Sequence, residues 1–445
     1  MFPSLPRVVL ASSFLVVSGS LVVSAPETAS RPVLSEFLGL NGHTVQFKPD
    51  LYQPVGRLVR DYHPVQWDLG DEPSKPPQFP LARNKVDWNQ VYGSWKKAGW
   101  ETEACLMFES VDRAKWKDLP GEARAYGKAF AEAFGPSGTR KLVRAVEIGN
   151  EPGSWSDEDY ATMFRAMAEG LRSGDPALRI ATCNLTASGS GKYEKSVRCI
   201  EGLLPLVDVL TIHTYPMLEQ WPTWKRSFPE DPRLPRYLPD VAALCRWRDQ
   251  KAPGKPVWIT EFGYDACTQP PPADGDFKQW TDVTDARQAQ WLVRSVLVFS
   301  SLPVERAYIY FFNDDDKPGL HASSGLTRHF QPKPAFHALA HLQSTLGEYR
   351  FEKIVRDEAG AVRIQQYRHG SQPKRIVWAL WSPTGEGREA EITLEVLPGR
   401  PVSATRMPAA PGPWKDEAEG WKPVGERSVK IRLTEDPLYL RIEEN

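Results

Sequence analysis

The chain has 445 residues, of which 41% are hydrophobic and 25% are charged, and its formal net charge is −1. This length exceeds the usual size of one hydrophobic core, so we expect a large domain and a smaller one. The near-zero charge and the lack of any basic run argue against a nucleic-acid partner.

Residues 1–25 have the pattern of a secretory signal peptide. Arg7 precedes the apolar run "VVLASSFLVVSGSLVV", and small residues such as Ala25 follow near an expected cleavage point. The run is shorter than the roughly 20 residues that span a membrane, and serines interrupt it, which disfavours an uncleaved anchor. We therefore expect a secreted, periplasmic or cell-surface protein with no membrane span after the signal is removed.

Short apolar strands alternate with longer amphipathic stretches over residues 36–343. The expected strands lie near residues 35–43, 55–63, 100–108, 141–152, 178–185, 207–216, 256–265 and 305–314. Helices are expected at 87–99, 121–135, 156–174, 196–205, 239–250, 286–303 and 333–347. Eight such units predict an α/β fold, a closed (β/α)8 TIM barrel. An open, doubly wound sheet is the alternative, but it usually begins with a Gly-rich first turn that this chain lacks.

The pattern changes after residue 344 to short strands separated by turn residues. The expected strands lie at 348–357, 361–369, 374–383, 389–398, 401–407, 427–433 and 437–445. This spacing predicts a C-terminal antiparallel β-sandwich over residues 344–445. Five cysteines are too few for a disulfide scaffold, although Cys183 with Cys199 and Cys245 with Cys267 are close in sequence.

Two predicted strands end in a glutamate that is followed by a turn. Alternation places Glu147 and Glu151 on one face of "AVEIGNEP", and Ile259 and Glu261 on one face of "VWITEFGYD". These are the fourth and seventh strands, and in a closed barrel their C-terminal ends open onto the same mouth. Cleaving a glycosidic bond needs one carboxylic acid to protonate the leaving oxygen and one carboxylate to attack or stabilise the anomeric carbon. An ionised Glu261 would help to keep a neighbouring Glu151 protonated.

The motifs "NEP" and "TEFG", in this order, resemble those of the clan A glycoside hydrolases, and the resemblance covers the whole predicted barrel. In that clan the fourth-strand glutamate is the acid/base, and the seventh-strand glutamate is the nucleophile of a retaining mechanism. The resemblance implies these catalytic roles for Glu151 and Glu261, respectively. Two unrelated strand-end acids are the alternative interpretation.

Four further residues match positions that support catalysis in that clan. Asn150 matches an asparagine that binds the sugar 2-hydroxyl, with a simple turn residue as the alternative. His213 and Tyr215 resemble the family 5-like His-x-Tyr pair that contacts the sugar and orients the nucleophile, although a core histidine would look the same. Arg60 matches an arginine that pairs with the nucleophile, and a structural ion pair is its alternative. Glu147, expected inside the barrel, needs a partner such as a barrel arginine.

The sequence contains 16 tryptophans, and several lie in loops that follow predicted strands. Trp155, Trp221, Trp224 and Trp280 belong to loops around the expected barrel mouth, where an aromatic ring can stack on a sugar. Packing within long loops is the alternative for each of them. On the eighth strand, where the clan commonly has a tryptophan, this chain has Tyr308, Tyr310 and Phe312 as substitutes.

A barrel followed by a sandwich resembles the β-xylosidase and α-L-iduronidase type of clan A enzyme, close to family 39. We therefore predict an exported retaining glycoside hydrolase that cleaves O-glycosidic bonds of a plant- or microbe-type glycan by double displacement. It would bind carbohydrate and need no cofactor and no catalytic metal. A non-catalytic carbohydrate-binding protein on the same fold and a transglycosidase are the alternatives.

Overall fold

The computed structural model describes residues 31–408 and 420–444 of the chain. The predicted signal peptide, residues 1–25, lies outside the described residues. Arg31–Asn445 form one compact unit. Within the described ranges, no helix has the length and apolar character needed to cross a membrane.

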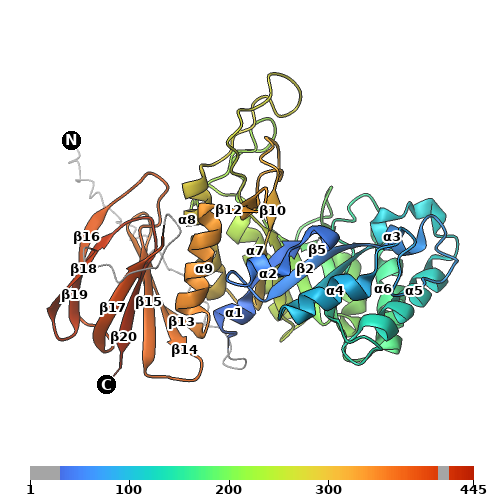
Figure 1. Ribbon diagram of the computed structural model, residues 1–445, viewed down its shortest axis with the longest axis horizontal. Helices are drawn as coiled ribbons and strands as arrows, with labels where there is room; N and C mark the ends of the chain where they lie inside the picture. Colours follow the sequence, from blue (N-terminus) through green and yellow to red (C-terminus); the bar gives the residue numbers. More distant parts are fainter. Residues whose placement is uncertain (1–30, 409–419, 445) are drawn as a thin grey trace, which may run out of the picture. The chain divides into compact units, whose positions relative to one another are not determined.

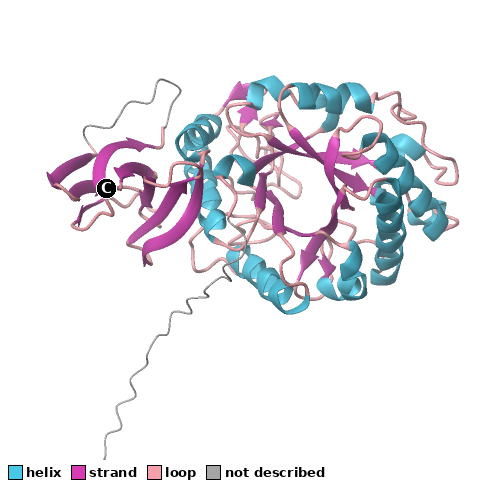
Figure 2. Ribbon diagram, turned by 90° about the horizontal axis from the view of Figure 1, so that it is seen from below, coloured by secondary structure: helices cyan, strands magenta, loops and turns pink. Residues whose placement is uncertain are grey.

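Eight parallel strands close into a barrel, which confirms the predicted (β/α)8 fold. Neighbouring strands pair in chain order around the ring, and the ring closes where the first strand pairs with the last. Figure 2 shows this ring surrounded by helices. The strands are β1 (Leu38–Gly42), β2 (Leu58–Pro64), β3 (Glu101–Met107), β4 (Val143–Ile148), β5 (Arg179–Thr186), β7 (Val209–His213), β8 (Val257–Phe262) and β9 (Arg306–Ile309). A two-residue strand, β6 (Lys195–Ser196), extends the sheet beside β5.

The long helices follow barrel strands along the chain where the amphipathic pattern placed them. They are α4 (Trp88–Lys97), α5 (Leu119–Phe134), α6 (Asp157–Gly174), α7 (Tyr237–Lys251), α8 (Asp285–Ser301) and α9 (Pro334–Leu346). Shorter turns are α1 (Leu34–Phe37), α2 (Pro49–Tyr52), α3 (Val65–Leu69), η1 (Thr44–Gln46), η2 (Phe108–Ser110) and η3 (Arg113–Lys115). The stretch expected as a helix at 196–205 is a 3-10 helix, η4 (Val197–Leu206), with Pro205 inside it. Proline lacks the amide hydrogen that a longer α-helix would need there.

The chain turns sharply at the end of β4 and brings the "NEP" motif to the barrel mouth. Gly149 has a φ of 84°, in the left-handed region that favours glycine. A Cβ atom at this position would lie 2.6 Å from the Phe108 ring, so no other residue fits without a shift. This turn places Asn150 and Glu151 just beyond the carboxyl end of the strand, where such barrels hold their functional groups.

Two antiparallel sheets follow the barrel, which confirms the predicted sandwich (Figure 1, orange to red). One sheet contains β13 (Tyr349–Glu358), β14 (Val362–His369), β15 (Arg375–Trp381), β20 (Leu438–Glu443) and β17 (Arg400–Arg406). The other contains β16 (Ala390–Leu394), β19 (Ser428–Leu433) and β18 (Trp421–Gly425). Strand β18 was not predicted, because its "WKPVG" sequence has the proline and glycine of a turn. A small sheet of β10 (Asn313–Asp314), β11 (Thr327–Arg328) and β12 (Gln331–Pro332) follows β9.

The five-stranded sheet is apolar on both faces. In β15, Trp378 and its same-face neighbours pack in the sandwich core, whereas Trp381 and its same-face neighbours join the core cluster that includes the barrel. The Trp381 indole also donates a hydrogen bond to Glu230 at 2.6 Å, and Tyr367 bonds Ser300 at the end of α8 at 2.8 Å. The sandwich therefore braces the barrel through a shared core.

Candidate active site

A cavity of about 660 Å³ opens at the carboxyl ends of the barrel strands. Its walls include most of the residues that the sequence predicted for the site, drawn from four strand ends or the loops that follow them. These are Asn150, Glu151, His213, Tyr215, Trp221, Glu261 and Tyr310. Arg60 and Trp155, which were predicted to contact substrate, are not among the residues that line this cavity.

Glu151 and Glu261 face each other across the cavity. One carboxylate oxygen of each lies within 4.8 Å of the other, with a His213 ring nitrogen in the same group. His213 Nδ1 lies 2.9 Å from Glu151 Oε1 and 3.5 Å from Glu261 Oε2. The histidine therefore lies between the two carboxylates in addition to lining the cavity.

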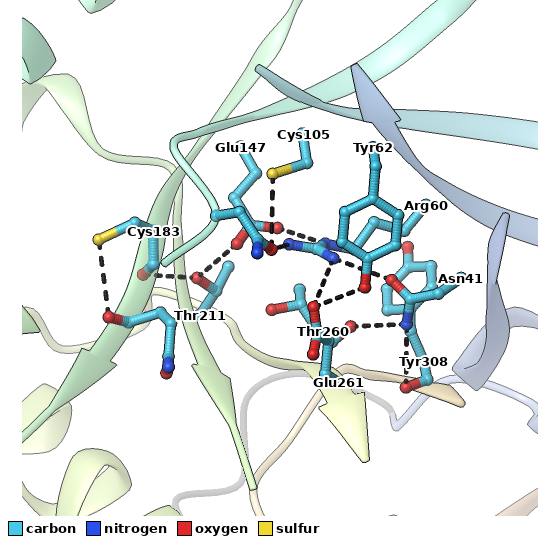
Figure 3. A network of polar contacts seen from close by, with 12 residues as sticks. Asn41, Arg60, Tyr62, Cys105, Glu147, Cys183, Thr211, Thr260, Glu261 and Tyr308 are labelled. Carbon is cyan, nitrogen blue, oxygen red and sulfur yellow. Dashed lines mark hydrogen bonds and ion pairs between the residues drawn. The ribbon is translucent and has the colours of Figure 1, made fainter. Parts of the chain in front are cut away.

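Glu261 is buried and held by three partners, of which Figure 3 shows Arg60 and Tyr62. The Tyr62 hydroxyl donates a hydrogen bond to Oε1 at 2.6 Å, and the Tyr215 hydroxyl donates one to Oε2 at 2.7 Å. Arg60 Nη1 donates to Oε1 at 3.2 Å. Burial alone would raise the pKa of Glu261, but the charges of His213 and Arg60 and the two tyrosine hydrogen bonds lower it to about 2. The carboxylate is therefore ionised and aimed before any ligand enters.

Arg60 lies beneath the cavity floor and does not reach its surface. Its side chain is fully buried and forms a 2.6 Å ion pair with Glu147, whose carboxylate also lies inside the barrel. Its Nη2 donates to Asn150 Oδ1 at 2.7 Å, and its Nη1 also donates to Asn41 Oδ1 at 2.9 Å. The structure does not place Arg60, predicted to bind substrate, at the cavity surface, because the guanidinium uses its donors on protein groups, as Figure 3 shows. Its predicted pairing with Glu261 is present, and Glu147 has the arginine partner that it needed.

His213 interacts with three carboxylates. Besides Glu151 and Glu261, its Nε2 lies 3.9 Å from Glu147 Oε1. Burial lowers the pKa of His213, but the charge of Glu261 and the hydrogen bond to Glu151 outweigh it, so the pKa is raised. A positive charge at this position favours the ionised form of Glu261.

The tryptophans of the mouth loops differ in burial and in whether they line the cavity. Trp155, predicted to contact the sugar, is only 7% exposed, packs edge-on against Phe108 with ring centroids 4.7 Å apart, and does not line the cavity. The apolar ring is instead used to pack the loop after β4. Trp280 is buried in the same way, whereas Trp224 lines the cavity. Trp221 is 69% exposed at the cavity wall, the arrangement that a sugar-stacking ring would have.

Three residues of this site were missed in the sequence. Tyr62 lies two positions after Arg60 on β2, so strand alternation could have shown that both side chains point the same way. Asn41 on β1 gave no comparable signal. Glu109 follows β3, and its Oε1 accepts hydrogen bonds from the backbone amides of Asn150 at 2.7 Å and Glu151 at 3.2 Å. Burial raises the pKa of Glu109 to about 7.

Among the described residues, Glu151, His213 and Glu261 form the group whose spacing could hold a metal ion. Two features of this group argue against a cation as its occupant. His213 Nδ1 already bonds Glu151 Oε1, and the permanent charge of Arg60 lies 3.2 Å from Glu261, where it would repel a second cation. All five cysteines are free, so neither of the cysteine pairs that are close in sequence forms a disulfide.

No family model matches the chain. A curated relative, an exo-α-(1→6)-L-arabinofuranosidase of Bifidobacterium longum, is 26% identical over 187 residues. That match covers 36% of this chain and 34% of the relative, so the shared segment spans about a third of each protein.

Solved structures of glycoside hydrolases share the fold over most of the chain. A family 39 glycoside hydrolase from Bacteroides cellulosilyticus has a TM-score of 0.66 and 17% identity, and the match covers 93% of this chain and 81% of that chain. A family 51 arabinofuranosidase from Xanthomonas axonopodis pv. citri has a TM-score of 0.62 and 14% identity, with 94% and 98% covered. A family 30 xylanase from Clostridium acetobutylicum has a TM-score of 0.57 and 10% identity, with 93% and 97% covered. The chain therefore has the fold of the clan A glycoside hydrolases, as its motifs indicated.

Proposed function

We propose that the protein is an exported retaining glycoside hydrolase that cleaves O-glycosidic bonds of a plant- or microbe-type glycan. One observation carries this proposal: Glu151 and Glu261 have carboxylate oxygens within 4.8 Å of each other at the mouth of a (β/α)8 barrel. Retaining enzymes hold their two carboxyl groups roughly 5–5.5 Å apart, whereas inverting enzymes leave roughly 6.5–9.5 Å for a water molecule.

Sequencing the N-terminus of the exported protein would test the signal peptide.

The reaction would proceed in two displacements. Glu261 attacks the anomeric carbon while Glu151 gives its proton to the leaving oxygen, so that one carbon–oxygen bond forms as the glycosidic bond breaks. Glu151, now a carboxylate, then takes a proton from water, and the water oxygen displaces Glu261 from the same carbon. Two inversions give net retention, and both glutamates return to their starting states.

A substrate panel tests this proposal. The mature protein should hydrolyse at least one aryl glycoside from a set that includes α-L-arabinofuranoside, β-D-xyloside and β-D-glucoside. These sugars follow the names of the similar proteins, which include arabinofuranosidases, xylanases and a glucosidase. Proton NMR during hydrolysis should show that the first product has the anomeric configuration of the substrate. Inversion would contradict the nucleophile role of Glu261, and inactivity on aryl glycosides and polysaccharides alike would contradict the function.

Removing the Tyr62 hydroxyl tests how Glu261 is kept ionised. Tyr62→Phe removes a 2.6 Å hydrogen bond to the carboxylate. Hydrogen bonds to charged groups contribute about 1.5–3 kcal/mol, so we expect the pKa of Glu261 to rise by roughly one to two units. Because catalysis needs the ionised form, the acidic limb of the kcat/KM profile should move to higher pH by a similar amount.

The matched control for this change is Tyr193→Phe. Tyr193 lines the same cavity, is 47% exposed, and has no hydrogen bond to Glu261 among the described residues. Its pH profile should overlay that of the parent protein. If the Tyr62→Phe profile also overlays the parent, the hydrogen bond does not set the ionisation of Glu261.

A further inference from the structure

His321 lies in the loop between β10 and β11 and forms part of the cavity wall. Its backbone amide donates to Asp265 Oδ2 at 3.0 Å, and the Ser324 hydroxyl donates to Asp265 Oδ1 at 2.6 Å. Asp265 follows β8, four positions after Glu261. The loop that carries His321 is therefore tied to the loop that follows Glu261.

The contact with Arg226 fixes which ring nitrogen of His321 carries the proton. Arg226 Nη2 lies 3.1 Å from His321 Nδ1. Arg226 Nη2 also forms a 2.7 Å ion pair with Asp265. Arg226 Nη1 donates to the Gly263 carbonyl at 2.8 Å, so the guanidinium is held in place. Arginine has only donors, so Nδ1 must accept, and a neutral ring then carries its hydrogen on Nε2.

The charges around His321 keep its ring neutral. Burial and the nearby charge of Arg226 lower the pKa of His321 to about 4, and His213 acts in the same direction. The carboxylates of Asp265 and Glu261 oppose this effect without reversing it. The Nε2–H tautomer therefore persists at neutral and mildly acidic pH.

The second ring nitrogen remains available to a ligand. Nε2 of His321 has no hydrogen-bond partner among the residues described, and it is not one of the fully enclosed polar atoms that lack a partner. The ring packs against Tyr215, with centroids 4.2 Å apart, and edge-on against Tyr310 at 5.7 Å. Tyr215 itself holds Glu261, so this donor lies close to the proposed nucleophile.

We propose that His321 determines specificity by donating a hydrogen bond from Nε2–H to a hydroxyl of the sugar beside Glu261. The inference rests on the proposed glycoside hydrolase function and adds a substrate contact to it. A donor that is fixed in place and cannot accept favours a sugar with an oxygen at that position. A sugar without this hydroxyl leaves the N–H unpaired in an enclosed site, which costs binding energy.

His321→Asn is the informative substitution. The backbone of His321 has a φ of 63°, in the left-handed region that asparagine tolerates better than most residues. The asparagine amide oxygen can still accept from Arg226, but the shorter side chain has no donor at the Nε2 position. We expect kcat/KM to fall by about 10- to 100-fold on the preferred glycoside.

His329→Asn is the matched control, because His329 has a φ of 51°, is exposed, and does not line the cavity. It should keep the parent kcat/KM. Monodeoxy glycosides then identify the contact: the parent should lose a similar factor on one deoxy sugar, and His321→Asn should lose little more on that same sugar. The proposal is overturned if His321→Asn has the parental kcat/KM. It is also overturned if kcat/KM of His321→Asn falls by the same factor, relative to the parent protein, on every deoxy sugar.

Nitrogen-15 NMR of the histidine rings tests the tautomer without relying on activity. The signals that disappear in His321→Asn should show an unprotonated Nδ1 and a protonated Nε2 from about pH 5 to 8. A proton on Nδ1, or a charged ring in this range, would overturn the proposal even in an active enzyme. A parent protein that hydrolyses no glycoside but shows the expected tautomer would instead contradict the proposed function.

Discussion

Glu261→Ala is expected to lower kcat by at least about 10⁴-fold on every substrate, because no other group can form the covalent intermediate. Glu151→Ala should behave differently. It should lose about 10²–10⁴-fold on substrates with poor leaving groups and much less on aryl glycosides with activated ones, because a good leaving group needs no proton. Steady-state kinetics on a series of leaving groups would measure this difference.

Azide separates the two roles further. In Glu151→Ala, azide can attack the glycosyl-enzyme intermediate, so we expect faster turnover and a product of retained configuration. In Glu261→Ala, azide can occupy the space of the missing carboxylate and attack once, so the product should be inverted. Glu194→Ala is the control, since Glu194 lines the same cavity but pairs with Arg236 at 2.8 Å. Equal losses on all leaving groups in both variants, with no response to azide, would contradict the assigned roles.

The barrel could be predicted because its units are local in sequence. Each strand is a short apolar run and each helix is amphipathic, so their order alone gives the ring and places Glu151 and Glu261 at one mouth. The "His-x-Tyr" pair could be placed for the same reason, because the alternation of β7 continues past its last residue, His213, and both side chains line the cavity. Local periodicity thus gives the position of a side chain along and across a strand.

Periodicity does not give the partner of a side chain or its depth below the surface. Arg60 was correctly paired with Glu261, but its three other bonds, which keep it away from substrate, depend on residues on β1 and on β4 and the turn that follows it. Trp155 could not be separated from Trp221, because both are loop tryptophans and only the packing of the loops buries one of them. His321 lies in a loop whose shape is set by Asp265, 56 residues away, and no sequence pattern indicates that contact.

Arg60→Met is expected to lower the free energy of unfolding by about 3–5 kcal/mol, because it removes the cation from a buried ion pair. Glu147 is fully buried and would lose the 2.6 Å contact to Arg60 that compensates its charge. The adjacent Glu103 offers no compensation, since it is also an acid, and its pKa is raised to about 8 by burial and by Glu147. Urea denaturation followed by near-ultraviolet circular dichroism would measure the loss.

A second substitution shows whether the loss of stability comes from the unpaired buried charge of Glu147. Arg60→Met combined with Glu147→Gln should recover most of the lost stability, because neither partner then carries a buried charge. Arg113→Met is the surface control, since the Arg113–Asp159 pair is partly exposed and such pairs contribute about 0–1 kcal/mol.

The pH dependence of this stability loss has a definite sign. Burial already raises the pKa of Glu147, and loss of Arg60 raises it further, so the native variant binds a proton that the unfolded chain does not. The stability deficit of Arg60→Met should therefore shrink as the pH falls from 7 towards the range in which unfolded glutamates titrate, about pH 4–5. A deficit that is independent of pH and unchanged by Glu147→Gln would show that Arg60 stabilises the barrel by packing alone.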